Sequence, residues 1–194
     1  MEGNKRAPAS ISRHGLSRRD FLVAGAAVTA ACLLPHKAVA GVAKVFSAER
    51  SLRFYNTHTD EKMKAVYWSE GTYVPQALVD INRILRDHRT GEMKEIDTSL
   101  LDLLFALQQR LESAGPFHII SGYRSPETNA LLRMISKGIA KNSLHTEGKA
   151  VDIRLPGYEL KTVRRAALDL QIGGVGYYPL SDFVHVDVGR VRYW

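Results

Sequence analysis

Two short segments, far apart in the chain, carry the residue types of a catalytic metal site. SLHTEGKAVDI (143–153) contains His145 and Asp152, and DFVHVDVGRVRYW (182–194) contains His185. Two imidazoles and one carboxylate suit Zn²⁺ and leave a fourth tetrahedral position open for water, which distinguishes a catalytic zinc site from a structural one. Taken alone, the first segment is also typical of a polar turn that enters a strand.

Strand alternation would bring these side chains together. Successive side chains of a strand point to opposite faces. Within 173–189, where we expect one or two closing strands, His185 lies opposite the valines on either side of it. In the strand expected at 149–155, Asp152 likewise lies opposite its apolar neighbours. Pairing these strands would place Asp152 beside His185, and the preceding loop would deliver His145.

The remaining segments predict an α+β domain. Alternating runs rich in β-formers predict strands, and apolar residues at helical spacing predict helices. The expected strands are 50–58, 61–71, 117–125, 149–155 and those within 173–189, and the expected helices are 74–91, 99–115, 126–138 and 159–170. Because strands and helices do not alternate regularly, we expect a mostly antiparallel sheet with helices packed on one side.

The first segment also matches a family signature. Ser143 to Asp152 reads SxHxxGxAxD at every fixed position and resembles the zinc D-Ala-D-Ala peptidases, which include murein endopeptidases and share their fold with the Hedgehog signalling domain. The resemblance extends over NTHT (56–59), SGYRSPETN (121–129) and VGYYPLSDFVHVDVGRVRYW (175–194). The last stretch is most similar to the murein endopeptidase K-type branch. A Hedgehog/DD-peptidase-like fold is therefore expected.

The resemblance implies one Zn²⁺ per chain, with His145, Asp152 and His185 as its ligands. Peptide hydrolysis also needs a group that takes a proton from the attacking water. The family often has a glutamate three residues before the late histidine, and here Asp182 occupies that position. Asp187, on the same strand face as His185, is the alternative, either as the proton acceptor or as a partner that fixes the imidazole. We favour Asp182.

Three further residues are expected to contact the substrate. Arg124, in SGYRS, resembles the family's substrate-binding arginine, and its guanidinium could bind a peptide carboxylate or polarise the oxyanion. A loop-pinning ion pair is its alternative role. Ser143 either orients its loop or contacts the substrate. Tyr177, like its neighbour Tyr178, either lines the groove or covers the sheet edge.

Residues 1–40 predict a signal of the twin-arginine (Tat) type. SRRDFLVAG (17–25) carries paired arginines before an apolar stretch, and AVA (38–40) suits a signal peptidase. The stretch is shorter than the about 20 apolar residues of a membrane helix. A retained signal anchor or a lipid on Cys32 are the alternatives. We expect a cleaved signal at 1–40, a single zinc peptidase domain at 41–194 and a periplasmic protein without a stable membrane span.

The signal also accounts for most of the positive charge. Residues 1–40 hold six Lys and Arg against two acidic residues, a net +4 of the total +7, so only +3 remains on 41–194. Global charge therefore gives no support for a nucleic-acid partner. Because the only cysteine, Cys32, lies in the signal, the mature chain has neither a cysteine nucleophile nor a thiolate zinc ligand.

These features together predict an exported, zinc-dependent murein endopeptidase whose partners are the peptide stems of peptidoglycan. The cross-link from D-Ala to diaminopimelate and the one between two diaminopimelates both fit this prediction. One alternative is a D,D-carboxypeptidase or dipeptidase of the same family, which would release terminal D-Ala. Another is a non-catalytic cell-wall-binding module that zinc stabilises.

Overall fold

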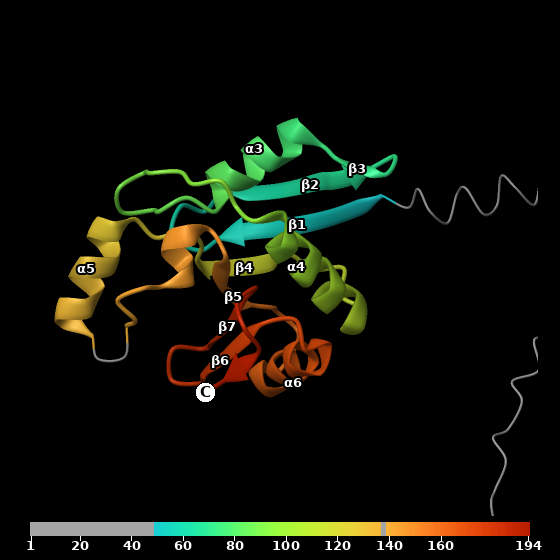
Figure 1. The fold of residues 1–194 in the computed structure, drawn as a ribbon. Coiled ribbons are helices and arrows are strands. Elements are labelled where there is room, and N and C mark those ends of the chain that lie inside the picture. The colour runs from blue at the N-terminus through green and yellow to red at the C-terminus, as the bar shows by residue number, and fades with distance from the viewer. Residues whose placement is uncertain (1–48, 137–138) are drawn as a thin grey trace, which may run out of the picture. The chain divides into compact units, whose positions relative to one another are not determined.

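An eight-stranded sheet organises the part of the chain that the computed structural model describes, residues 49–136 and 139–194. Its strand order is β3-β2-β1-β4-β5-β7-β6-β8 (Figure 1). The strands are β1 (Arg50–Asn56), β2 (Lys62–Ser69), β3 (Thr72–Tyr73), β4 (Phe117–Ser121), β5 (Ala150–Arg154), β6 (Gly174–Tyr178), β7 (Phe183–Asp187) and β8 (Arg192–Tyr193). The predicted signal, its cleavage after Ala40 and the alternative lipid site at Cys32 lie outside the described residues.

The sheet is antiparallel except at two places. β1 pairs in parallel with β4, and β6 pairs in parallel with β8. A parallel pair needs a long crossover, and β2, β3 and two helices lie between β1 and β4 in the chain. The predicted α+β class is therefore confirmed, with a mixed sheet in which antiparallel pairing predominates.

Four α-helices and one short 3₁₀-helix are described. They are α3 (Pro75–Ile84), α4 (Thr98–Arg110), α5 (Pro126–Ile135), α6 (Leu160–Leu170) and the 3₁₀-helix η2 (Leu144–Glu147). α3 is shorter than the predicted 74–91, because the Asp87 carboxylate accepts hydrogen bonds from the backbone N–H groups of Arg89 and Ser125 and turns the chain. Within the described ranges, no helix has the length and apolar character needed to cross a bilayer.

One hydrophobic core joins the sheet to three of the helices. α3, α4 and α6 bury apolar residues in a cluster with the inward side chains of the strands, as expected for helices packed on one side of the sheet. α5 differs, because its buried residues are the polar Thr128 and Asn129. Figure 1 shows α5 apart from α4 and α6.

The central strand β5 separates the core from the polar face of the sheet. Its Val151 and Ile153 are fully buried in the core, whereas Asp152, between them, points to the opposite face by strand alternation. β5 pairs with β4 on one side and β7 on the other. Asp152 is therefore held on an interior strand that is hydrogen-bonded on both sides.

Candidate metal centre

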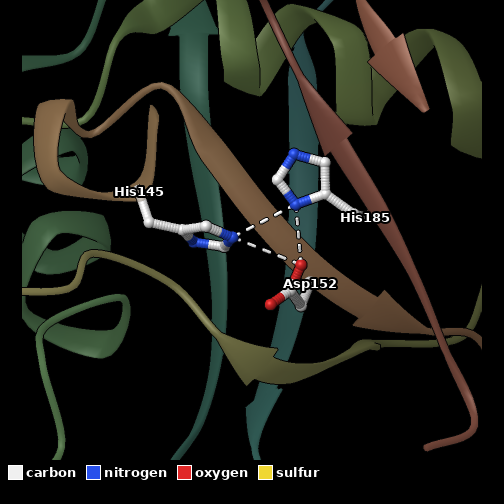
Figure 2. Close-up of side chains that lie close together, drawn as sticks. All are labelled: His145, Asp152 and His185. Atoms are coloured by element: carbon white, nitrogen blue, oxygen red, sulfur yellow. Dashed lines mark hydrogen bonds and ion pairs between the residues drawn. The ribbon is translucent and has the colours of Figure 1, made fainter. Parts of the chain in front are cut away.

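Strand register brings Asp152 and His185 side by side. β5 and β7 are antiparallel, and the two residues are direct partners across the pair. His145 reaches them from η2, the 3₁₀-helix that precedes β5. Figure 2 shows the three side chains pointing at one another, and one potential ligand atom from each lies within 4.8 Å of the other two. The structure thus assembles the trio that the sequence singled out.

The loop before β5 is shaped to present His145. The Ser143 hydroxyl accepts a hydrogen bond from the His145 backbone N–H at 3.4 Å, at the start of η2. Gly148 ends η2 with a φ of 72°, in the left-handed region where glycine is favoured. A side chain at Gly148 would also collide with the Glu95 carbonyl. The glycine of the motif is therefore required by both backbone conformation and close packing.

The outer nitrogens of both histidines fix which nitrogen faces the cluster. His145 Nδ1 lies 2.8 Å from the Gly122 carbonyl oxygen, and His185 Nε2 lies 3.0 Å from Asp187 Oδ2. A carbonyl and a carboxylate can only accept, so both outer nitrogens donate a proton. The lone pairs of His145 Nε2 and His185 Nδ1 are then left to face Asp152.

The resulting cluster consists of three acceptor atoms. His145 Nε2 lies 3.1 Å from His185 Nδ1 and 3.3 Å from Asp152 Oδ1, and His185 Nδ1 lies 2.8 Å from Asp152 Oδ1. Tetrahedral zinc with nitrogen and oxygen ligands would hold such atoms about 3.3 Å apart. Acceptors that converge in a buried place need a cation or a proton between them. The donor set and its spacing therefore fit Zn²⁺.

The contacts within the cluster stabilise the ionised form of Asp152 and the protonated form of His185. Burial alone would raise the pKa of the Asp152 carboxyl, but His145 and His185 hold it well below its usual range. Burial alone would lower the pKa of His185, but its hydrogen bonds to Asp152 and Asp187 raise it to about 9. Without a metal ion, a proton on His185 would supply the positive charge that the acceptors require.

Asp187 is fully buried and all its hydrogen-bonding positions are used. Oδ2 accepts from His185 Nε2 at 3.0 Å and from an Arg192 nitrogen at 2.7 Å. Oδ1 accepts from the other Arg192 nitrogen and from the backbone N–H groups of Gly174 and Gly189. The arrangement suits a partner that orients His185 and leaves no free oxygen for a water molecule.

Asp182 has a different environment. It lies in the turn before β7 at a φ of 53°, and its side chain is largely exposed. Its Oδ2 lies 2.7 Å from Arg154 Nε. Arg154 lies two residues after Asp152 on β5 and so on the same face of the sheet, which places Asp182 on the cluster's face but in an ion pair.

Arg124, three residues after the end of β4, lies near Asp152. One guanidinium nitrogen lies 3.6 Å from Asp152 Oδ2 and 3.3 Å from the Ser121 hydroxyl, and the other lies 3.4 Å from Asn129 Oδ1. The side chain is almost fully buried, and its Nε finds no hydrogen-bond partner among the described residues. Arg124 thus approaches the cluster through the terminal nitrogen that lies near Asp152.

A groove-lining role, one of the two alternatives for Tyr177, does not fit its position. Tyr177 pairs with Val184, on the face opposite His185, and its ring lies under the Arg164 guanidinium of α6. Tyr178 is the tyrosine on the face of the cluster, since it pairs with Phe183. Strand parity identifies Tyr178 only once the turn between β6 and β7 is placed, and the sequence left open whether 173–189 holds one strand or two.

Two further residues near the cluster were not expected there. Arg192 binds Asp187, and the Trp194 ring lies 5.3 Å from the His185 ring, centroid to centroid. Both come from the end of the chain, which we interpreted from sequence without assigning it a strand. The signal that could have found them is the alternation of Gly174 and Gly176 on β6, which leaves room over that strand.

Comparisons with known proteins agree with the resemblance. A family model described as peptidoglycan L,D-endopeptidase MepK (Peptidase_M15_2) matches residues 44–194. The peptidoglycan L,D-endopeptidase MepK of Escherichia coli (strain K12) is 42% identical over 178 residues, which cover 92% of this chain and 97% of that protein. The probable peptidoglycan L,D-endopeptidase MepK of Haemophilus influenzae is 36% identical over 179 residues, 92% of this chain and 95% of that protein.

The N-terminal segment has a match of its own. A model of the twin-arginine translocation signal matches residues 15–35. The predicted export through the Tat pathway to the periplasm is therefore confirmed.

Proposed function

This chain belongs to the family described as peptidoglycan L,D-endopeptidase MepK, and from that premise we propose that it is a zinc-dependent endopeptidase that cuts peptide cross-links of peptidoglycan. The observation that carries the proposal is the convergence of His145 Nε2, His185 Nδ1 and Asp152 Oδ1 on one point, where neutral imidazoles whose outer nitrogens carry the protons leave only acceptors. A buried arrangement of acceptors is costly unless a cation occupies it.

Each residue of the cluster has a proposed task. His145, Asp152 and His185 would hold the ion, and Asp187 would fix the His185 ring by accepting its Nε2–H. A bound Zn²⁺ lowers the pKa of its water towards about 7 and polarises the scissile carbonyl. With three protein ligands, the position that a water and the substrate need stays open.

Asp182 is our proposed proton acceptor. Asp187 has no unused oxygen, whereas the Asp182 carboxylate is exposed and bound only on one side, by Arg154. Asp182 would exchange this partner when substrate enters, take a proton from the attacking water and pass it to the leaving amine. Arg124, with a terminal guanidinium nitrogen beside Asp152, would donate a hydrogen bond to the carbonyl oxygen or to a nearby carboxylate of the substrate.

The stereochemistry in the relatives' names favours one of the two cross-links. A bond between two diaminopimelates joins an L centre to a D centre, whereas a bond from D-Ala to diaminopimelate joins two D centres. The relatives are named L,D-endopeptidases. We therefore propose the link between two diaminopimelates as the substrate.

The domain boundaries and the fold name also remain proposals. We propose that residues 41–194 form a single peptidase domain after cleavage of the signal, and one compact unit over Ser47–Trp194 supports this. The Hedgehog/DD-peptidase-like fold stays a prediction from the family resemblance.

Purified cross-linked muropeptides test the proposal. The zinc-loaded protein should convert dimers joined through two diaminopimelates into monomers, as seen by mass spectrometry, and a chelator should stop the reaction until zinc is restored. Release of terminal D-Ala alone would instead identify a carboxypeptidase. Binding of muropeptides without any product would identify a non-catalytic wall-binding module.

A further inference from the structure

The end of the chain reaches across the sheet to the metal cluster. Trp194 continues β8 beside β6, because its N–H donates to the Val175 carbonyl and its own carbonyl accepts from Tyr177. Gly176 lies between Trp194 and His185, as the direct partner of His185 on β7. A Cβ on Gly176 would lie 2.8 Å from the indole carbons, so the ring lies directly over the glycine backbone.

The indole is the exposed neighbour of a buried ligand. Trp194 is 46% exposed and His185 only 8%, and their ring centroids are 5.3 Å apart with the rings tilted by 47°. An apolar surface therefore borders the cluster on the solvent side. A substrate bound beside His185 would lie next to this surface.

Tyr178 completes the surface and adds a hydrogen-bond donor. The Trp194 indole N–H donates to the Tyr178 hydroxyl at 2.7 Å, which leaves the phenol's own hydrogen free to donate. Among the described residues, no acceptor for that hydrogen is found. The Tyr178 ring stacks on Phe183 at 4.5 Å, which holds it in place.

Arg124 follows β4 and lies 3.6 Å from Asp152 on β5, whereas Tyr178 lies on β6, beyond β7 in the strand order. A peptide bound at the cluster would therefore meet donors from two sides, Arg124 and the Tyr178 hydroxyl. It would meet an apolar wall on one side only, at Trp194.

We propose that Trp194 and Tyr178 form an aromatic wall that binds the substrate residue next to the scissile bond. The residue that fits has an unbranched aliphatic side chain for the indole and a carbonyl or carboxylate for the phenol hydroxyl. Diamino acids with a methylene chain between two polar ends have this chemistry. The inference rests on the proposed function and adds the residues that select the substrate.

Steady-state kinetics of variants test the wall. The probe is a sugar-free dimer of two stem tripeptides joined through their diaminopimelates, cut by zinc-loaded protein. Trp194→Ala should lower kcat/KM about 10- to 100-fold, mainly through KM, because an apolar contact with the substrate is lost. Tyr178→Phe should lower it about 10-fold, because only the hydroxyl is removed.

Tyr193→Ala is the matched control. Tyr193 is 73% exposed and adjacent to Trp194, but it pairs with Val175, whose side chain lies on the core face of β6. This variant should keep the wild-type kcat/KM. Full activity of Trp194→Ala would overturn the wall, and so would a loss of activity confined to substrates that carry sugars.

Zinc affinity separates the wall from a merely structural role. Trp194→Ala and Tyr178→Phe should bind zinc as tightly as the wild type in competition with a chromogenic chelator. A fall in zinc affinity as large as the fall in kcat/KM would make Trp194 a support for His185 and would overturn the wall.

Intrinsic fluorescence gives a second measurement if Trp194→Ala fails to fold. The chain has two tryptophans, Trp68 and Trp194, and Trp68 lies on β2, far from β6 in the strand order. In zinc-loaded Trp68→Phe protein, the stem tripeptide should give a saturable fluorescence change. The Trp194→Phe protein should give none, and the reverse result would refute the wall.

The outcome that would refute the proposed enzyme function differs from the outcome that would refute the aromatic wall. A wild-type protein that binds zinc and cuts no cross-linked peptide would refute the function itself. A wild type that cuts the dimer, together with a fully active Trp194→Ala variant, would refute the wall alone.

Discussion

Two aspartates that contact this sheet, Asp102 and Asp152, differ in the balance of hydrogen-bond donors and acceptors around them. Near β1 and β2, Asp102 of α4 accepts from the Arg50 guanidinium at 2.7 Å and from the hydroxyls of Tyr67 and Tyr73 at 2.9 and 2.8 Å. Every contact there joins a donor to an acceptor. At β5 and β7, Asp152 Oδ1 instead lies 2.8 Å from His185 Nδ1 and 3.3 Å from His145 Nε2, the ring nitrogens that carry no proton when both imidazoles are neutral.

The difference separates a structural network from a functional one. The Asp102 network is complete within the protein, so its value is stability. The acceptors of the Asp152 cluster lack a positively charged partner until an ion or a proton binds. Burying them therefore costs folding free energy, which a bound ion would offset. Counting donors and acceptors around a carboxylate thus distinguishes the two roles better than burial does.

The largest effect is expected from His185→Ala. Removing one of three ligands should abolish stoichiometric zinc binding and all hydrolysis of cross-linked muropeptides. Zinc content by inductively coupled plasma mass spectrometry and product analysis check this. His118→Ala is the control, since His118 lies on β4 and packs against Tyr55 of β1. The His118→Ala protein should keep its zinc. Normal zinc content in His185→Ala would show that the Asp152 cluster is not the metal site and would remove its difference from the Asp102 network.

Asp182→Asn should affect turnover and spare the metal. An amide cannot accept the proton from water, so kcat should fall about 10²- to 10⁴-fold while zinc content stays at one per chain. Chelator competition and initial rates on muropeptide dimers measure both quantities. An Asp182→Asn protein with wild-type kcat would exclude Asp182 as the proton acceptor.

Asp187→Asn should weaken the metal site itself. The neutral amide orients the His185 ring less firmly than the carboxylate, so zinc affinity should fall about 10- to 100-fold. The dissociation constant from chelator competition is the measurement. Unchanged zinc affinity with reduced kcat would indicate that Asp187 acts on the water, contrary to our proposal.

Asp102→Asn should change stability and nothing else. Loss of the charged acceptor for Arg50, Tyr67 and Tyr73 should lower the free energy of unfolding by roughly 1–3 kcal/mol, measured by urea denaturation. Zinc affinity should be unaffected. Asp80→Asn, on the exposed side of α3, is the control for loss of a surface carboxylate. A zinc defect in Asp102→Asn would erase the distinction between the two networks.

Asp87 should give the smallest effect, as a dependence of stability on pH. Burial would raise its pKa, but hydrogen bonds from Thr128, Ser125 and Arg89 hold it at about 2, below the ordinary 3.8. Its contribution, about 2 kcal/mol, is therefore complete above about pH 4 and is lost as the pH falls through about 2.

Denaturation of zinc-free wild type and zinc-free Asp87→Asn tests this. The difference in their free energies of unfolding should shrink between pH 4 and pH 2, because this range spans the ordinary pKa of 3.8 and the folded-state pKa of about 2. A difference that stays constant over this range would show that Asp87 has an ordinary pKa in the folded protein.

The sequence predicted those features that depend on local alternation. Asp152 and His185 lie on the polar faces of their strands, as their apolar neighbours require, and the structure pairs them directly. The end of α3 could not be predicted, because it depends on the contact of Asp87 with Ser125, 38 residues away. Local periodicity carries no information about such a contact.

The positions of Tyr177, Tyr178 and Trp194 could not be predicted from the local sequence pattern. The choice between Tyr177 and Tyr178 depends on the turn that joins β6 to β7, since a shift of one residue exchanges the two faces. The place of Trp194 depends on the parallel pairing of β8 with β6. A two-residue strand at a sheet edge has no periodicity from which that pairing could be inferred.

The most direct test of the cluster is an anomalous difference map at the zinc absorption edge from crystals of the zinc-loaded protein. We expect one peak about 2.0–2.2 Å from His145 Nε2, His185 Nδ1 and Asp152 Oδ1. An ion bound through His185 Nε2, or zinc located elsewhere with these three atoms still in mutual contact, would contradict the account.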